Sequence, residues 1–177
     1  PRGQFDFLKA GESVVQTFDY VLEDAGGLQS SATVSITITG VNDIPEDLVS
    51  AGDMERAATT VITSRQLNIN DQDDPSSNIL LTVTSDPAHG TLLLDGQEIS
   101  VGATFTMQDV LNGKLAYAHD NSLPGRDGFD FTAENPGDAG TLITGRFDMQ
   151  IVTPPGGLDL IGDNGANSLI GSKVADR

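Results

Sequence analysis

The chain has 177 residues, with 9 Lys and Arg against 26 Asp and Glu, and a formal net charge of −17 at pH 7. This excess of negative charge repels phosphate backbones and anionic lipid, so nucleic acid is excluded as a partner and cations are favoured. The absence of cysteine excludes disulfides, zinc–thiolate sites and thiol nucleophiles. Apolar runs are too short to span a bilayer, so we expect no membrane insertion by this segment. Without an initial Met or a signal stretch, it is predicted to be a piece of a longer polypeptide.

The first 43 residues carry the pattern of a β-hairpin. Residues 31–39 alternate Thr or Ser with apolar side chains, which is typical of a half-buried antiparallel strand. Residues 18–22 show the same alternation, and the turn Asp24-Ala25-Gly26-Gly27 lies between the two segments. Because so few strands cannot close a sandwich, residues 1–43 are predicted to be the C-terminal part of a domain whose other strands precede them.

Residues 44–153 are predicted to form a complete domain. Pro45 ends the preceding segment, because proline cannot donate to a strand ladder. Short strand candidates separated by turn pairs such as Asp95-Gly96 follow, at residues 64–70, 79–84, 90–94, 114–117, 129–132 and 147–152. One helical turn is expected at residues 106–111, with Thr106 as its cap and Gly113 as its end. The predicted fold class is therefore all-β, a tandem antiparallel β-sandwich of the immunoglobulin or cadherin type.

The tail, residues 154–177, begins with Pro154-Pro155-Gly156-Gly157 and contains an internal repeat. Leu160-Ile161-Gly162 recurs nine residues later as Leu169-Ile170-Gly171. This period resembles the calcium-binding nonapeptide array of repeat-in-toxin proteins. The match is degenerate, because Asn167 replaces the ligand Asp of the first unit while Asp176 keeps the carboxylate of the second. Two interpretations stay open: the entry to a longer β-roll, or a linker that only resembles one.

An acidic loop, Asp71-Gln72-Asp73-Asp74-Pro75, follows a probable strand. Calcium takes six to eight oxygen ligands, so a loop with Asp at i and i+2 is a natural half-site. The loop is not an EF-hand, because position six is Ser76 and position twelve is Thr82. The alternative is a solvated acidic turn. Around Asp120 and Asp127 a structural role is favoured over metal binding.

Two segments resemble bacterial cadherin-like repeats. The first resemblance, to the end of a VCBS domain, covers residues 8–45 and is carried by Glu12, Tyr20, Asp24-Ala25-Gly26-Gly27, the strand 31–39 and Val41-Asn42-Asp43-Ile44-Pro45. The second covers residues 46–153, which are similar to the cadherin-like repeat of chondroitin sulfate proteoglycan type. Its motifs are Asp71-Gln72-Asp73-Asp74, Pro87-Ala88-His89-Gly90-Thr91-Leu92, Gly102-Ala103-Thr104-Phe105-Thr106, Asn112-Gly113-Lys114-Leu115-Ala116-Tyr117-Ala118-His119-Asp120 and Asp127-Gly128-Phe129-Asp130-Phe131.

These resemblances imply a calcium site (Ca²⁺) at the junction between the two domains. In cadherins the ion is held by acids of the first domain, an Asn-Asp linker and an Asp-x-Asp of the next. Transferred to this sequence, and with Asp74 and the tail acid added, the implied metal ligands are Glu12, Asp24, Asn42, Asp43, Asp71, Asp73, Asp74 and Asp176. Gly40 and Ile44 stand where many cadherin linkers carry Asp and Asn. We therefore expect fewer calcium ions than at an animal cadherin junction, namely one.

Nothing in the sequence indicates an enzyme. His89 and His119 are the only histidines and belong to the ordinary framework of the family that the segment resembles. No nucleophile elbow, His-Glu-x-x-His or phosphate-binding glycine loop occurs. Seven Phe, two Tyr and no Trp leave little for a sugar-stacking cleft.

The sequence thus predicts a non-enzymatic, calcium-rigidified repeat segment of a large bacterial secreted or surface protein. It would act extracellularly as an adhesin stalk or cell-adhesion array, with neighbouring repeats of the same polypeptide as partners and cell-surface or matrix polysaccharide or protein as further candidates. Two alternatives remain, a carbohydrate-binding sandwich and a metal-free spacer.

Overall fold

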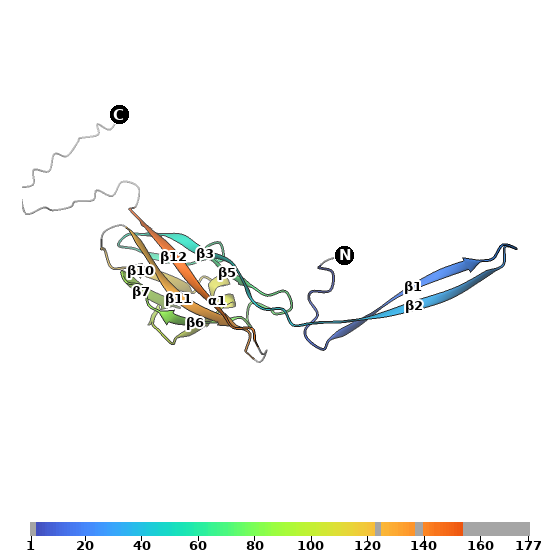
Figure 1. Ribbon diagram of the computed structural model, residues 1–177. Coiled ribbons are helices and arrows are strands. Elements are labelled where there is room, and N and C mark those ends of the chain that lie inside the picture. Colours follow the sequence, from blue (N-terminus) through green and yellow to red (C-terminus); the bar gives the residue numbers. More distant parts are fainter. Residues whose placement is uncertain (1–2, 123–124, 137–139, 154–177) are drawn as a thin grey trace, which may run out of the picture.

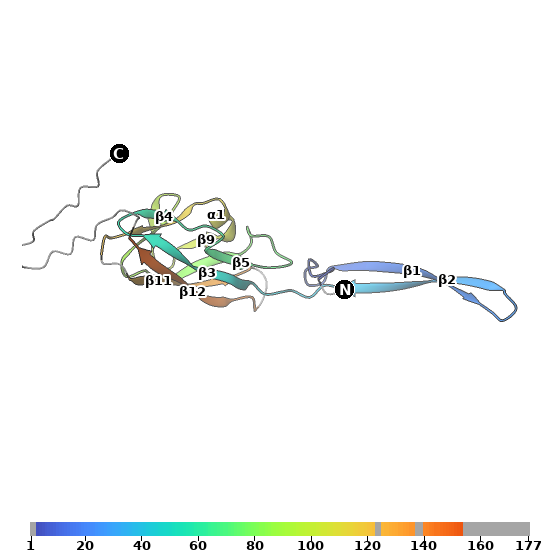
Figure 2. The same cartoon turned by 90° about the horizontal axis from the view of Figure 1, so that it is seen from above.

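A computed structural model describes residues 3–122, 125–136 and 140–153. Within them the chain is all-β, as predicted, with a long hairpin and a β-sandwich joined by residues 40–45 (Figures 1 and 2). The hairpin projects away from the sandwich in both views. None of the helices in the described ranges has the length and hydropathy needed to cross a membrane. The tail repeat, including Asp176, lies outside the described residues.

The hairpin consists of β1 (Ser13–Glu23) and β2 (Gln29–Thr39), paired antiparallel from Ser13 opposite Thr39 to Glu23 opposite Gln29. Because side chains alternate along each strand, this register places the larger apolar side chains on one face, namely Val14, Phe18, Tyr20, Leu22, Val34, Ile36 and Ile38. The expected pairing is confirmed, but the expected half-burial is not. Phe18 is 53% exposed, and no other described segment covers this face.

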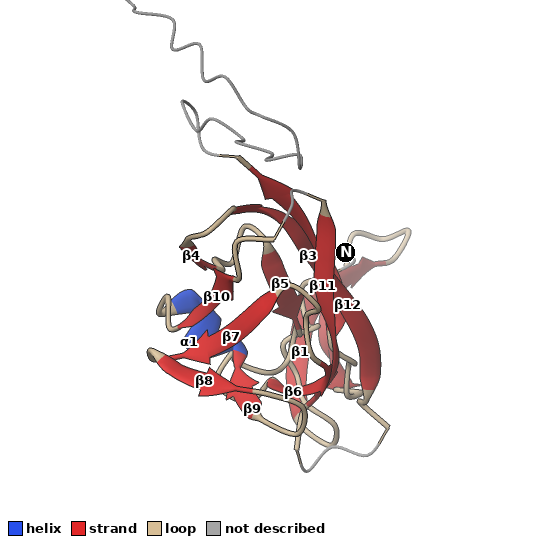
Figure 3. Cartoon of the chain, turned by 90° about the vertical axis from the view of Figure 1, so that its left-hand side faces the viewer, coloured by secondary structure: helices blue, strands red, loops and turns tan. Residues whose placement is uncertain are grey.

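The sandwich is built from two sheets that face each other (Figure 3). A six-stranded sheet has the order β5-β3-β12-β11-β6-β9, and a four-stranded sheet has the order β4-β10-β7-β8. The strands are β3 (Glu46–Glu55), β4 (Thr59–Val61), β5 (Leu67–Asn70), β6 (Leu80–Ser85), β7 (Gly90–Leu94), β8 (Gln97–Ile99), β9 (Thr104–Thr106), β10 (Leu115–His119), β11 (Arg126–Glu134) and β12 (Ile143–Val152).

Alternating apolar side chains of both sheets meet in one core. Phe129, Phe131 and Phe147, from β11 and β12, are at most 1% exposed, so the predicted inward direction of Phe129 and Phe131 is confirmed. Tyr117 of β10 closes the core from the opposite sheet. Removing these apolar surfaces from water is the main stabilisation of the sandwich.

One helical turn, α1 (Met107–Leu111), lies where the sequence predicts it. The hydroxyl of Thr106 accepts from the backbone of Asp109, whose carboxylate in turn accepts from the Thr106 backbone. This capping box satisfies donors that the first turn leaves unpaired. Gly113 follows the helix with φ +71°, a left-handed conformation that glycine adopts without steric cost.

The sequence does not predict β3, β4, β8 or β9. Three of them have only three residues. The fourth, β3, is half-exposed and mixes acids with small residues, so it lacks clear alternation. It pairs parallel with β12, whereas every other described pair is antiparallel.

Candidate metal centre

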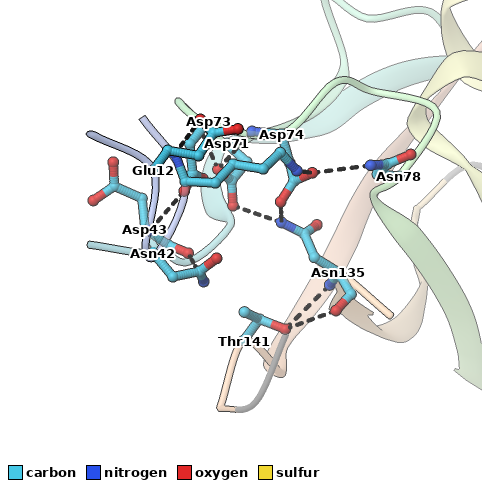
Figure 4. A network of polar contacts seen from close by, with 10 residues as sticks. Glu12, Asn42, Asp43, Asp71, Asp73, Asp74, Asn78, Asn135 and Thr141 are labelled. Carbon is cyan, nitrogen blue, oxygen red and sulfur yellow. Dashed lines mark hydrogen bonds and ion pairs between the residues drawn. The ribbon is translucent and has the colours of Figure 1, made fainter. Parts of the chain in front are cut away.

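Three buried carboxylates gather at the end of the sandwich that faces the linker (Figure 4). Asp71, Asp73 and Asp74 follow directly after β5 and are 6%, 8% and 7% exposed. One oxygen from each lies within 4.8 Å of the others. Oxygens bound to the same calcium ion are each about 2.3–2.6 Å from it, so this spacing suits a shared cation.

The loop is held in shape by its own first aspartate. Asp71 Oδ1 accepts from the backbone N–H of Asp73 at 3.1 Å and from that of Asp74 at 3.2 Å. Such an Asx turn folds the loop back on itself and points all three carboxylates to one side. Leu67 and Ile69, both buried, anchor the preceding strand in the core.

Asn135, at the end of β11, completes the centre from a distant part of the sequence. Its Nδ2 donates to Asp71 Oδ2 at 2.8 Å and to Asp74 Oδ2 at 3.0 Å. The Thr141 hydroxyl fixes its backbone, accepting from Asn135 N at 3.2 Å and donating to its carbonyl at 3.3 Å. Sequence reasoning missed this residue, because only the pairing of β11 with β6, the strand that follows the acidic loop, would have indicated it.

Two buried oxygens of this centre have no hydrogen-bond partner in the part of the chain that the structure describes, namely Asp73 Oδ1 and Asn135 Oδ1. Buried polar atoms are nearly always satisfied, and each exception carries a desolvation cost. A cation beside the three carboxylates would satisfy Asp73 Oδ1, whereas Asn135 presents its Nδ2 to them and its Oδ1 would face the same cation only with the amide turned over. The donor set of carboxylates and an amide oxygen is the set that calcium prefers, so the residues fit that ion.

The surroundings of Asp73 disfavour the ionised form of its carboxyl group. Burial raises the pKa of Asp73 to about 6, aided by its interaction with Asp71 and by repulsion from Asp71 and Asp74, while a hydrogen bond from the Asp43 backbone acts in the opposite direction. A positive charge at this point would favour the ionised form of all three acids.

The linker and the start of the hairpin contribute further predicted ligands. Figure 4 shows Glu12, Asn42 and Asp43 beside the acidic loop. The Asp43 backbone N–H lies 3.4 Å from Asp73 Oδ2, and Asn42 Nδ2 donates to the Asp43 carbonyl at 2.6 Å. The structure thus brings six predicted residues to one place, namely Glu12, Asn42, Asp43, Asp71, Asp73 and Asp74.

Asp24 requires a correction, because the structure places it at the far tip of the hairpin. It follows the last residue of β1, eleven paired positions from the linker end. Its Oδ1 accepts from Gly26 N at 2.8 Å and from Leu28 N at 3.0 Å, so it shapes the turn. Asp24 is therefore not a ligand of this centre.

A cation from the chain itself also reaches the centre. The Lys9 ammonium forms an ion pair with Asp74 Oδ1, which also accepts from Asn78 Nδ2 at 2.9 Å. The sequence analysis did not single out Lys9, whose position depends on a tight turn rather than on a strand pattern.

The histidines have structural surroundings. His119 is 8% exposed, and its Nδ1 accepts from Ala57 N at 3.3 Å and from Asn121 N at 3.1 Å. These bonds use Nδ1 as an acceptor and fix a loop. The backbone of His89 donates to the Asp127 carboxylate and its carbonyl accepts from Tyr117.

Comparison with known proteins supports the same fold. A family model described as "Cadherin-like" matches residues 50–146, which include the acidic loop and Asn135. Human FRAS1-related extracellular matrix protein 2 is 29% identical over 112 residues, which cover 62% of this chain and 4% of that protein. Mouse extracellular matrix organizing protein FRAS1 is 31% identical over 121 residues, covering 67% and 3%. Extracellular matrix protein 3 of Lytechinus variegatus is 32% identical over 132 residues, covering 68% and 4%.

The chain therefore spans only a small fraction of the length of these relatives. Each relative is named as an extracellular matrix protein, in agreement with the extracellular location predicted from the sequence.

Proposed function

Because the chain belongs to the cadherin-like family, we propose that it is a non-enzymatic repeat segment whose junction is rigidified by calcium. The observation that carries the proposal is the buried, unpartnered Oδ1 of Asp73, which lies in a cluster with the carboxylates of Asp71 and Asp74. A bound cation would satisfy the Asp73 oxygen and neutralise the repulsion among the acids.

The position of the centre suits a role in rigidity. It lies between the linker, the start of the hairpin and the sandwich (Figure 4). Ligands from all three parts would restrict the angle between the hairpin and the sandwich once an ion binds. Asp71, Asp73, Asp74 and Asn135 would form the inner part of the site, with Asp43, Asn42 and Glu12 on the side of the linker. Binding to the folded state alone stabilises it in proportion to the logarithm of occupancy.

We further propose that the hairpin is the end of a preceding sandwich of the VCBS type. Its apolar face carries no charged side chain at any of the residue pairs that point to that side, from Val14 and Ile38 to Leu22 and Ser30. An isolated two-stranded hairpin is marginally stable in water, so strands from another part of the polypeptide would cover this face. Tandem domains of this kind, in a large bacterial secreted or surface protein, would form a stalk or adhesive array in the extracellular medium. The nonapeptide repeat of the tail would extend the array beyond the sandwich.

The carbohydrate-binding alternative has less support. In the sandwich every Phe and Tyr side chain belongs to the buried core. Exposed Phe and Tyr side chains occur only near the N-terminus and on the hairpin, as in Phe7, Phe18 and Tyr20, among the described residues. A groove of about 550 Å³ beside the linker is lined by Asp43, Pro45, Asn70 and Gln72 among others, without an aromatic residue. A sugar ring would therefore find no stacking surface there.

The test is a thermal melt of the chain in chelator, in millimolar calcium and in magnesium at equal ionic strength. A calcium-specific rise is expected, about 2.7 kcal/mol at 100 times the dissociation constant. Asp73→Asn and Asn135→Leu should remove the rise, whereas Asp24→Asn, at the hairpin tip, should leave it intact. If calcium and magnesium act alike, or if Asp24→Asn alone removes the rise, the proposed site is wrong.

A further inference from the structure

The start of the hairpin is held against the linker by a close contact at Gly40. A Cβ at Gly40 would lie 2.3 Å from the Leu8 carbonyl oxygen and 2.4 Å from that of Lys9. Gly40 N donates to the Glu12 carbonyl at 2.8 Å, and Glu12 N donates to the Lys9 carbonyl at 3.0 Å. Leu8, only 7% exposed, packs in the same turn. Only glycine allows this approach, so an Asp here would push the turn of residues 5–12 away.

This turn determines where the Lys9 side chain goes. Its ammonium pairs with Asp74 Oδ1, inside the cluster of three buried carboxylates. The Asp74 side chain is 1% exposed, whereas that of Lys9 is 40% exposed. The ammonium thus enters the centre from the solvent side and brings positive charge to acids that otherwise repel one another.

We propose that Lys9 is the resident counter-cation of the acidic centre. In the metal-free state its ion pair connects the hairpin side of the junction to the sandwich. When calcium binds, the two cations compete, because both require Asp74 and repel each other. The second half of this inference depends on the proposed calcium site; the first half does not.

The geometry explains how one cation replaces the other without unfolding. A side chain that is 40% exposed can swing into water while the turn that carries it stays on Gly40. The unpartnered Oδ1 of Asp73 is not satisfied by the Lys9 ammonium and is available to a divalent ion. Lys9 would therefore set the calcium concentration at which the Lys9–Asp74 ion pair is replaced by a bound calcium ion as the bridge across the junction.

The experiment compares the 177-residue chain with Lys9→Met, Lys9→Arg and a matched control, Lys114→Met. Lys114 pairs with Asp109 at 2.9 Å and its side chain is 41% exposed, so it resembles Lys9 in exposure and differs in place. The first measurement is the calcium affinity by calorimetry at low ionic strength. Because a unit charge next to the ion is removed, Lys9→Met should bind calcium about tenfold more tightly, and Lys9→Arg and Lys114→Met should bind as the parent does.

The second measurement needs no calcium. The chain has no cysteine, so spin labels are placed through Ala25→Cys at the hairpin tip and Glu98→Cys on the sandwich. In chelator, Lys9→Met should broaden the distribution of distances between the labels, and Lys9→Arg and Lys114→Met should not.

The outcomes separate the two proposals. Broadening in chelator without calcium binding by any variant would support Lys9 as counter-cation and refute the calcium site. An unchanged distribution in chelator would overturn Lys9 as the metal-free bridge. Unchanged or weaker calcium binding by Lys9→Met, where the parent binds, would overturn the competition.

Discussion

Two buried aspartates of the same sandwich, Asp127 and Asp73, have opposite environments. Asp127 is 6% exposed and its carboxylate accepts from Ala88 N at 2.8 Å, His89 N at 3.0 Å, Gly128 N at 2.8 Å and Tyr117 Oη at 2.7 Å. Asp73 is 8% exposed, has two carboxylates as neighbours and leaves one oxygen unpartnered among the described residues.

The pKa values follow this difference. Burial acts to raise the pKa of Asp127, but hydrogen bonds from Tyr117 and from three backbone N–H groups outweigh it and lower the pKa. Around Asp73 burial and neighbouring acids raise the pKa to about 6. Burial alone therefore does not assign a role to an acid; the donors around it do. Asp127 is a structural residue that connects the two sheets, whereas Asp73 keeps one unpartnered oxygen beside two other carboxylates in the described part of the chain.

The largest expected effect comes from Asp127→Asn. The amide keeps the shape but cannot accept from all four donors, so the free energy of unfolding should fall by about 3 kcal/mol. Urea denaturation measures this. Asp148→Asn, which alters an exposed partner of Arg146, is the control and should change stability by less than about 0.5 kcal/mol. An equal effect of both variants would contradict the structural role of Asp127.

Lowering the pH should gradually remove the contribution of the ionised Asp127 carboxylate to the free energy of unfolding. Because the folded-state pKa of Asp127 is lowered, the unfolded chain binds its proton more readily. The stabilisation is complete above the ordinary pKa of about 3.9 and is lost as the pH falls below it. The stability difference between the parent and Asp127→Asn should therefore narrow progressively as the pH falls below about 4. If the stability difference widens as the pH falls, the pKa of Asp127 is not lowered in the folded state.

Tyr117→Phe removes one donor of the same network. Its hydroxyl also lies 2.9 Å from the His89 carbonyl, and the ring keeps its place in the core. The unfolding free energy should fall by about 1–1.5 kcal/mol. The Phe129–Phe147 ring pair, with centroids 5.3 Å apart, should keep its near-ultraviolet signal. Loss of that signal would mean that repacking, rather than the hydrogen bond, causes the effect.

Asp73→Asn should act in the opposite direction to Asp127→Asn. In chelator, a neutral amide relieves repulsion from Asp71 and Asp74, so stability should rise by about 0.5–1 kcal/mol. In calcium the same variant should lose the metal-dependent rise. A decrease in chelator comparable to that of Asp127→Asn would mean that Asp73 is structural as well.

The smallest effect on the sandwich is expected from Gly40→Ala. The added Cβ displaces the turn of residues 5–12, so the label distances should broaden while the unfolding free energy of the sandwich changes by less than about 0.5 kcal/mol. Gly125→Ala is the control, because a Cβ there meets nothing within 4 Å. An unchanged distribution in Gly40→Ala would show that the contact does not position Lys9.

The sequence predicted what depends on local pattern. The alternation in residues 31–39, the Thr106 cap and the inward Phe129 and Phe131 follow from period and from capping chemistry, and the structure contains all of them. The acidic loop was predicted because Asp71 and Asp73 are neighbours in the chain. Sequence reasoning failed where contacts are long-range.

Asn135 and Lys9 show this limit at the centre. They reach Asp74 across 61 and 65 residues, through a strand pairing and a glycine contact that no local pattern encodes. The prediction for Asp24 fails because the eleven-residue strand β2 separates the hairpin tip from the linker. The parallel β3–β12 pairing likewise could not be predicted from local pattern, because the paired residues lie almost a domain length apart in the sequence.

That pairing has a mechanical consequence. β3 continues from the linker, β12 leads toward the opposite end of the sandwich, and the two run side by side in the same direction (Figure 1). Tension applied along the chain pulls β3 back by its first residue and β12 forward by its last, so the adjacent strands are loaded in shear. All hydrogen bonds between Asp148–Ala51 and Val152–Glu55 then resist together instead of opening one after another. The β3–β12 pair is thus loaded in the geometry that best resists tension applied along the chain.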